Sequence, residues 1–150
     1  MVLRLAAILL SGALSVLSGV AAHGETGGAG DDVSHFTGVD TRNYNARIEE
    51  SRTKGETWAN LPLSIATNLF GPADYTEGRM KCSVEYSQNQ PDTAIVTVTV
   101  EGNLDDSVSA ERRVIKFSKQ SDKWMIGDLR LGFKCQAGRG HTSYSGQLCR

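Results

Sequence analysis

The residues best suited to chemistry lie near the end of the chain, in Cys135-Gln136-Ala137-Gly138-Arg139-Gly140-His141, a tail that Cys149 closes. Glycines on both sides of Arg139 can adopt positive φ, so that successive backbone N–H groups could face one anion. Arg139 and His141 would add positive charge. The pattern predicts a binding loop for a carboxylate, a phosphate or a sulfated sugar. The simpler alternative, and the more common one, is a tight turn in which the glycines only meet the backbone geometry.

Three cysteines, Cys82, Cys135 and Cys149, leave three pairings open, each with one free thiol. We favour Cys135–Cys149, because the segment between them is rich in Gly, Ser and Thr and flexible enough to close. Closing a loop of that length stabilises a fold by about 3 kcal/mol in the chain-entropy model. Cys82 would then pack as a small apolar residue of a strand. The rival pairing Cys82–Cys135 would join two strands and leave the tail mobile.

Carboxylates and arginines elsewhere give weaker candidates. Asp105-Asp106-Ser107 could help to bind a hard cation such as calcium, but no further oxygen ligands follow at regular spacing. Asx-type hydrogen bonds that cap a hairpin are the better interpretation. Asp128 lies beside a predicted bulge and could act as a base inside a cavity. A surface cross-strand salt bridge worth well under about 1 kcal/mol is the interpretation we favour for it. The neighbouring strand positions could face the cavity or the solvent; they hold Arg112, Arg113 and Arg130.

No pattern in the chain points to a metal or a cofactor. His23 and His35 have no partners at the spacing of a zinc site. The sequence has no Gly-x-Ser-x-Gly, no His-Glu-x-x-His, no phosphate-binding loop and no dinucleotide fingerprint. We therefore predict no metal, no cofactor and no catalytic residue, and a non-enzymatic protein is the favoured class.

Residues 1–22 are typical of a secretory signal peptide. Arg4 precedes an apolar run from Leu5 to Leu17, and Val20-Ala21-Ala22 suits cleavage after Ala22. Serines and glycines interrupt the run and no basic stop-transfer flank follows, which favours cleavage over a retained membrane anchor. The prediction is a secreted or periplasmic protein without a membrane span, in a compartment where disulfides form.

The charge and the length of the rest of the chain limit its possible functions and its number of domains. Of the 16 Lys and Arg residues only Arg4 lies in the signal segment, which leaves 15 basic and 17 acidic residues. This near balance argues against a nucleic-acid binder, which needs a clustered basic face. Residues 23–40 begin with a polar, Gly-rich stretch and are predicted to be a flexible leader. Residues 41–150 have the length of a single domain with one core.

Two helices are predicted before the middle of the chain. The first begins near Thr41 and is interrupted at Gly55. The second covers residues 60–70, with Asn60 as its N-cap and Pro62 in its first turn, and a Gly-Pro pair ends it. An apolar stripe at three- and four-residue spacing would cover a sheet. Its members are Trp58, Leu61, Ile65 and Leu69.

In the second half of the chain the hydrophobic period falls to two, which predicts four antiparallel strands. They cover approximately Arg79–Tyr86, Ala94–Val100, Val108–Ser118 and Trp124–Cys135. In the last strand Trp124 and Ile126 share one parity, whereas Leu129 and Leu131 share the other. A β-bulge near Gly127-Asp128 would shift the phase by one residue and bend the strand. The predicted fold class is α+β, with N-terminal helices on the concave side of a curved four-stranded antiparallel sheet.

Several motifs carry a resemblance. The pattern Trp58…Pro62…Ala66…Phe70-Gly71, then Asp105-Asp106-Ser107-Val108 and Cys-x-x-Gly-Arg-Gly-His…Cys, resembles a family of small exported bacterial proteins. The resemblance covers the chain from about Tyr44, and Tyr144 stands where a Trp is typical of the family. It implies a cystatin-like or nuclear-transport-factor-like cone. That fold hosts enzymes, binding proteins and inhibitors, so it implies no single function.

The function expected from these patterns is that of a non-enzymatic binding or interaction module. Its loop would present Arg139, His141 and Tyr144, flanked by Gly138 and Gly140, to a protein partner or a small anionic ligand. A disulfide-closed loop is pre-organised and loses less entropy on docking. One alternative is an inhibitor whose loop enters the cleft of an extracellular hydrolase. Another is a small hydrolase or isomerase that uses the cone cavity, with its base beside the predicted bulge. Cone domains also pair through the open sheet face, which makes a homodimer an alternative partnership.

Overall fold

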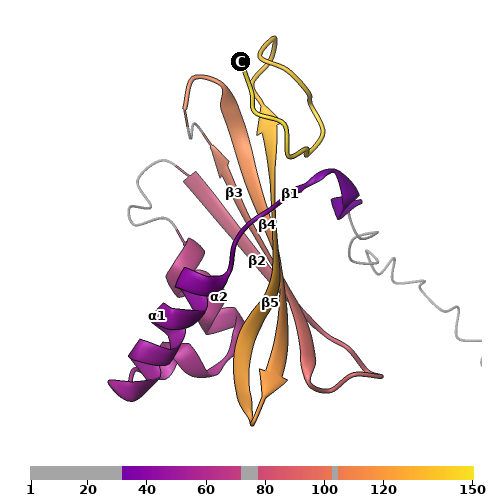
Figure 1. The fold of residues 1–150 in the computed structure, drawn as a ribbon. Helices are drawn as coiled ribbons and strands as arrows, with labels where there is room; N and C mark the ends of the chain where they lie inside the picture. Colours follow the sequence, from indigo (N-terminus) through magenta and orange to yellow (C-terminus); the bar gives the residue numbers. More distant parts are fainter. Residues whose placement is uncertain (1–31, 72–77, 103–104) are drawn as a thin grey trace, which may run out of the picture.

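A computed structural model describes residues 32–71, 78–102 and 105–150 (Figure 1). The predicted signal peptide, 1–22, and residues 23–31 of the predicted leader lie outside these ranges. Within them, none of the helices has the length and apolar character needed to cross a membrane.

Two α-helices precede most of the sheet along the chain. Helix α1 covers Arg42–Thr53 and helix α2 covers Pro62–Phe70, with a short 3₁₀ turn, η2 (Thr57–Asn60), between them. The predicted N-cap was one residue early: Asn60 ends η2, and Leu61 is the N-cap with an extended backbone. Proline follows at the first helical position, where its missing N–H costs no hydrogen bond.

The sheet has five strands, all paired antiparallel, in the order β1-β5-β4-β3-β2. The strands are β1 (Thr37–Gly38), β2 (Gly78–Tyr86), β3 (Thr93–Gly102), β4 (Val108–Gln120) and β5 (Lys123–Cys135). The predicted number of four was therefore wrong. The additional strand, β1, pairs with β5 and comes from the last residues of the segment assigned to the leader. Two residues are too few to show an alternating pattern.

The predicted bulge in the last strand is confirmed. Asp128 pairs with Lys116 whereas Ile126 pairs with Phe117, so Gly127 is the extra residue. The bulge shifts the alternation of inward- and outward-facing residues by one position. Apolar residues on both sides of the bulge can therefore face the same side of the sheet. Those buried around it are Trp124, Ile126 and Leu129.

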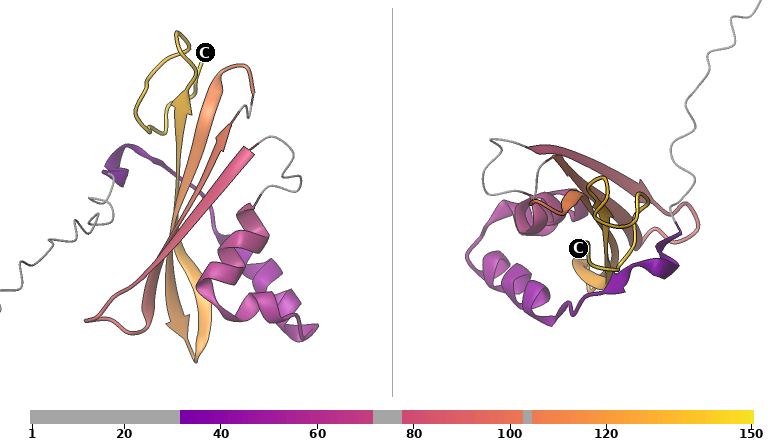
Figure 2. Two further views of the ribbon diagram at one scale, coloured as in Figure 1. Left: turned by 180° about the vertical axis from the view of Figure 1, so that it is seen from behind. Right: turned by 90° about the horizontal axis from the view of Figure 1, so that it is seen from above.

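The helices pack on one face of the twisted sheet (Figure 2). We call this the helix face, and the opposite side the outer face. Alternate residues of β3 and β4 meet side chains such as Ile48, Ile65 and Phe70 there and form the hydrophobic core. Burial of each large apolar side chain contributes about 1.5–3 kcal/mol. The predicted stripe needs one correction: Leu61 is 57% exposed, because as the N-cap it precedes the first turn of α2.

Candidate functional site

The predicted disulfide pairing is confirmed: Cys135 and Cys149 are joined, with their Cα atoms 5.4 Å apart. Cys82 is the free cysteine. It lies in β2, partly buried against the core. Burial raises the pKa of the Cys82 thiol, which keeps it protonated and makes it a poor nucleophile.

The glycines beside Arg139 are explained by local geometry. The Arg139 amide donates to the Gln136 carbonyl at 3.0 Å, and Gly138, the third residue of this turn, has φ +78° as a type II turn requires. Gly140 has φ +144°, and a Cβ there would lie 2.9 Å from Cys135 Sγ. The Arg139 amide is thus occupied within the turn. These contacts support the tight-turn interpretation over a nest of free amides.

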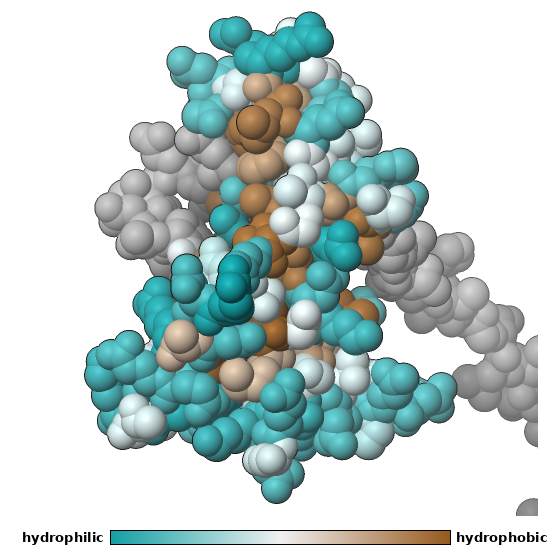
Figure 3. Space-filling view, in the orientation of Figure 1, coloured by the Kyte–Doolittle hydropathy of each residue, from teal (hydrophilic) through white to brown (hydrophobic). Residues whose placement is uncertain are grey.

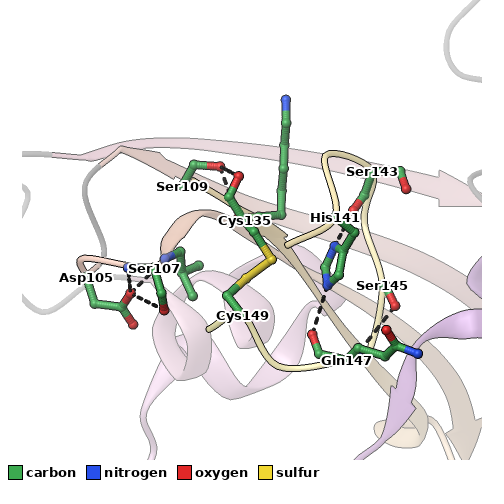
Figure 4. Close-up of a disulfide and its surroundings, with 11 residues drawn as sticks. Asp105, Ser107, Ser109, Cys135, His141, Ser143, Ser145, Gln147 and Cys149 are labelled. Carbon is green, nitrogen blue, oxygen red and sulfur yellow. Dashed lines mark hydrogen bonds between the residues drawn. A yellow bond between two sulfur atoms is a disulfide. The ribbon is translucent and has the colours of Figure 1, made fainter. Parts of the chain in front are cut away.

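His141 points into the loop and connects two of its segments (Figure 4). Its Nδ1 lies 2.8 Å from the Ser143 carbonyl oxygen, and its Nε2 lies 3.0 Å from that of Gln147. A ring with one proton donates to one of these carbonyls, and the imidazolium donates to both. In each state the ring is held by the backbone of the loop. His141 is therefore a brace inside the loop instead of a group presented to a ligand.

Tyr144 is also turned toward the protein. The Arg112 guanidinium lies 3.9 Å from the centroid of its ring, and the Phe36 ring lies 6.4 Å away. Phe36 in turn covers Gly132 on the outer face of β5, where a Cβ would come within 2.7 Å of the phenyl ring. The cation–π contact contributes about 1 kcal/mol. Tyr144 anchors the loop to the sheet and is not a free contact residue.

Backbone hydrogen bonds fix the loop from two further directions. Ser145 and Phe133 exchange N–H···O bonds of 2.7 and 3.0 Å, which extends the pairing along β5. The Gly146 amide donates to the His35 carbonyl at 2.7 Å, and Thr37 Oγ1 donates to the Gly146 carbonyl. The segment before β1 therefore holds the C-terminal loop. Nothing in the sequence marks this pairing of segments more than 100 residues apart.

We call three exposed residues of the loop the loop tip: Arg139, Leu148 and Arg150. The Arg150 amide donates to the Arg139 carbonyl at 2.8 Å, which ties the two arginine backbones together. Leu148 is 80% exposed. Of the predicted loop residues, Arg139 is thus exposed; Leu148 and Arg150, which are also exposed, were not predicted. A single leucine among polar residues has no periodicity from which its exposure could be predicted.

A cavity of about 430 Å³ opens on the helix face, between the C-terminal end of α2 and strands β3–β5. Its polar residues include Glu111 and Arg113, which form an ion pair with both side chains less than a quarter exposed. The Arg113 guanidinium also lies 5.4 Å from the Phe70 ring centroid. Sequence analysis left the orientation of Arg113 open and missed Glu111, because Ser-Ala-Glu-Arg-Arg shows no clear alternation.

Asp105 belongs to the same cavity and caps the turn before β4 (Figure 4). Its Oδ1 accepts from the amides of Ser107 and Val108 at 2.6 and 2.7 Å, and from the Ser107 hydroxyl at 2.9 Å. These bonds, first that from the Ser107 amide, lower the pKa of Asp105. The predicted Asx-type cap is confirmed.

The capped turn also contacts the disulfide. The Gln136 amide donates to the Ser107 carbonyl at 2.7 Å, and Ser109 Oγ donates to the Cys135 carbonyl at 3.2 Å. The turn from Asp105 to Ser109 therefore lies between the cavity and the C-terminal loop. One segment connects the two regions that carry the candidate chemistry.

Asp128 lies on the outer face, because the bulge turns Leu129 toward the helices. It accepts a hydrogen bond of 2.9 Å from Arg130 Nε, and its side chain is 48% exposed. It lines neither the cavity nor the loop tip. The predicted surface ion pair is present, but it joins two residues of β5 and does not cross to a neighbouring strand. The enzymatic alternative loses the base it requires.

The described residues bring one set of metal-binding side chain types together: Cys135, His141 and Cys149, whose ligand atoms lie within 4.8 Å of one another. A metal binds the thiolate form of cysteine, and the disulfide removes both thiolates. The arrangement is therefore a disulfide with a neighbouring imidazole. These residues do not fit a metal in the oxidised protein.

Comparison with known proteins gives no relative: no family model, curated protein or solved structure matches the chain. The resemblance of its motifs to a family of small exported proteins stays a prediction. Its function is therefore argued from the geometry of the loop tip and the cavity.

Proposed function

We propose that the protein is an exported, non-enzymatic binding module that docks an acidic segment of a partner protein through its loop tip. The observation that carries the proposal is Leu148, 80% exposed next to two exposed arginines. An exposed leucine by itself needs no explanation. Its place on a braced loop, between Arg139 and Arg150, gives it the composition of a small recognition surface.

The contacts that fix the C-terminal loop make its loop tip suitable for docking. The disulfide, the His141 contacts and the Tyr144–Arg112 stack fix the loop from three sides. Side chains on a fixed backbone lose only their own rotamer entropy on binding, about 0.5–1.5 kcal/mol each. A mobile tail would also lose backbone entropy. The arrangement therefore lowers the cost of association at this surface.

The chemistry of the loop tip indicates the partner. Arginine binds carboxylates through two parallel hydrogen bonds, and two arginines here flank one apolar side chain. The matching surface has one or two Asp or Glu residues beside an apolar residue. The predicted signal peptide and the disulfide support a place outside the reducing cytoplasm. An inhibitor of an extracellular hydrolase would use the same surface, so it differs in the identity of the partner alone.

The test is a selection of phage-displayed peptides on the oxidised protein. We expect enriched peptides to combine Asp or Glu with a large apolar residue, and their affinity to fall at least about tenfold in Arg139→Glu and in Leu148→Ser. Arg79→Glu changes an exposed arginine at the start of β2 and serves as the matched control. The proposal is overturned if no peptide is enriched, or if the enriched peptides bind Arg139→Glu as well as the wild type.

A further inference from the structure

The cavity on the helix face has the dimensions of a small-molecule site. Its volume of about 430 Å³ lies within the range of roughly 300–1,000 Å³ typical of ligand pockets. Its apolar lining consists of Leu69, Phe70, Val100, Val108 and Phe133. Figure 3 shows apolar surface along the middle of the molecule, bordered by hydrophilic residues. Apolar surface rimmed by polar residues is typical of binding grooves.

The charges in the lining do not cancel. Glu111 and Arg113 neutralise each other in their ion pair. Asp105 adds a second carboxylate, and its hydrogen bonds come from two amides and a hydroxyl, which carry no charge. These three groups leave one negative charge beside an apolar wall. The capping bonds keep that carboxylate ionised near neutral pH, because they lower its pKa.

The unneutralised negative charge of the lining favours one class of ligand over the others. An organic anion would meet two carboxylates, and the one guanidinium is already paired. An uncharged apolar molecule would fit the wall but would leave the extra carboxylate without a counterion. An organic cation satisfies both, because its charge can face Asp105 while its apolar body covers Phe70 and Phe133. Aromatic faces add cation–π attraction to such ligands.

We propose that this cavity binds a small organic ammonium ion with an apolar body. The inference is independent of the docking function of the loop tip, because it rests on residues of α2, β3, β4 and β5. Its carrying observation is a cavity whose lining combines apolar side chains with an ion pair and a surplus carboxylate. The ligand class is defined by its single positive charge and by a body of about the size of a phenyl ring with a short chain.

Three probes with the same three-carbon chain test the charge selectivity: 3-phenylpropan-1-ammonium, 3-phenylpropan-1-ol and 3-phenylpropanoate. Isothermal titration of the intact, oxidised protein at low salt gives their affinities. We expect the cation to bind about tenfold more tightly than the alcohol, and the carboxylate to bind most weakly. Equal affinities for cation and alcohol, tighter binding of the carboxylate, or no binding of the cation at about 10 mM would each overturn the proposal.

Two substitutions separate charge from shape. Asp105→Asn retains the Oδ1 acceptor of the cap and removes the charge, so cation affinity should fall about two- to fivefold while alcohol affinity is unchanged. Glu111→Gln releases Arg113 from its pair, so carboxylate affinity should rise by a similar factor. Asp128→Asn, on the outer face, is the matched control and should change neither.

Thermal unfolding of each variant verifies that it folds, and if Glu111→Gln does not, Asp105→Asn carries the test alone. Unchanged cation binding in Asp105→Asn would overturn the proposal. Leu148→Ser distinguishes the two sites, because it should abolish peptide docking and leave cation binding intact. Loss of cation binding in Leu148→Ser would also contradict the assignment, since Leu148 does not line the cavity.

Discussion

The C-terminal loop and the helix-face cavity differ in how they use their polar groups. In the loop, the His141 ring and the Arg139 amide are bonded to carbonyls of the loop itself, and the exposed side chains of the loop tip form the proposed contact surface. In the cavity, Glu111 and Arg113 bond to each other, and Asp105 is bonded to two amides and a hydroxyl, which leave its charge unneutralised. The loop therefore gains rigidity from its polar groups, whereas the cavity retains electrostatic selectivity.

Because of this difference, the two regions are suited to recognise different kinds of partner. A braced loop offers fixed side chains to a large partner, and its specificity depends on shape. A cavity with a surplus charge offers selectivity to a small ligand, and its specificity depends on electrostatics. The turn from Asp105 to Ser109 contacts both regions. Substitutions in this turn should therefore affect both the C-terminal loop and the cavity.

The largest effect is expected from removing the disulfide that closes the C-terminal loop. Cys149→Ser opens a loop of sequence separation 14 and should lower the free energy of unfolding by about 3 kcal/mol. The measurement is denaturant unfolding of the oxidised wild type and the variant. Cys82→Ser is the control and should cost less than about 1 kcal/mol, because Cys82 is unbridged and only partly buried. If both variants lose equal stability, the disulfide does not stabilise the loop in the way proposed.

A smaller effect is expected from the ion pair of the cavity, and its pattern distinguishes stability from function. Arg113→Ala leaves Glu111 unpaired and less than a quarter exposed, so the free energy of unfolding should fall by about 2 kcal/mol. Replacing both residues, in Glu111→Leu with Arg113→Met, should be nearly neutral, because apolar packing can substitute for a buried pair. Urea unfolding of the two variants measures both values.

A double variant that is as unstable as Arg113→Ala would show that the pair is needed for the fold. The contrast with the loop would then disappear, because both regions would use their polar groups for stability. A neutral double variant would instead leave binding as the reason for two charged residues in an apolar cavity.

The sequence predicted the parts of the molecule that depend on local patterns. The parity conflict around Gly127 identified the bulge, and residue composition between Cys135 and Cys149 identified the disulfide. Each of these signals is contained within a few residues. Alternation, turn residues and loop flexibility act over the same short distance as the structures they produce.

The sequence could not predict contacts between distant segments. The inward direction of His141 and Tyr144 depends on carbonyls of the loop and on Arg112 in β4. Strand β1 pairs with β5 directly after Phe36, whose ring lies over Gly132. Such contacts depend on where the backbone has already been placed, and a residue pattern does not contain that information. For this reason, two of the three side chains expected to recognise a partner instead hold the loop.

The smallest effect, and the one that links the two regions, concerns the Asp105 cap in acid. The folded state lowers the pKa of Asp105 from 3.8, chiefly through its bond from the Ser107 amide. A lowered pKa stabilises the fold above the unfolded value, and this stabilisation disappears as the pH falls through the folded value. Asp105→Asn should therefore be less stable than the wild type at pH 7, and the difference should shrink as the pH falls below about 4.

Urea midpoints of the two proteins across this pH range measure the effect. Other carboxylates also titrate there, among them Asp40, whose pKa is lowered to about 2, so the quantity to follow is the difference between wild type and variant. Asp106→Asn is the matched control, because its carboxylate forms no hydrogen bond with the described residues of the turn and its substitution removes no bond of the cap. A difference for Asp105→Asn that does not change with pH would mean that the cap acts through its shape alone. In that case the charge of Asp105 would be free of any structural task, which would sharpen the contrast between a loop built for rigidity and a cavity that keeps its charge for a ligand.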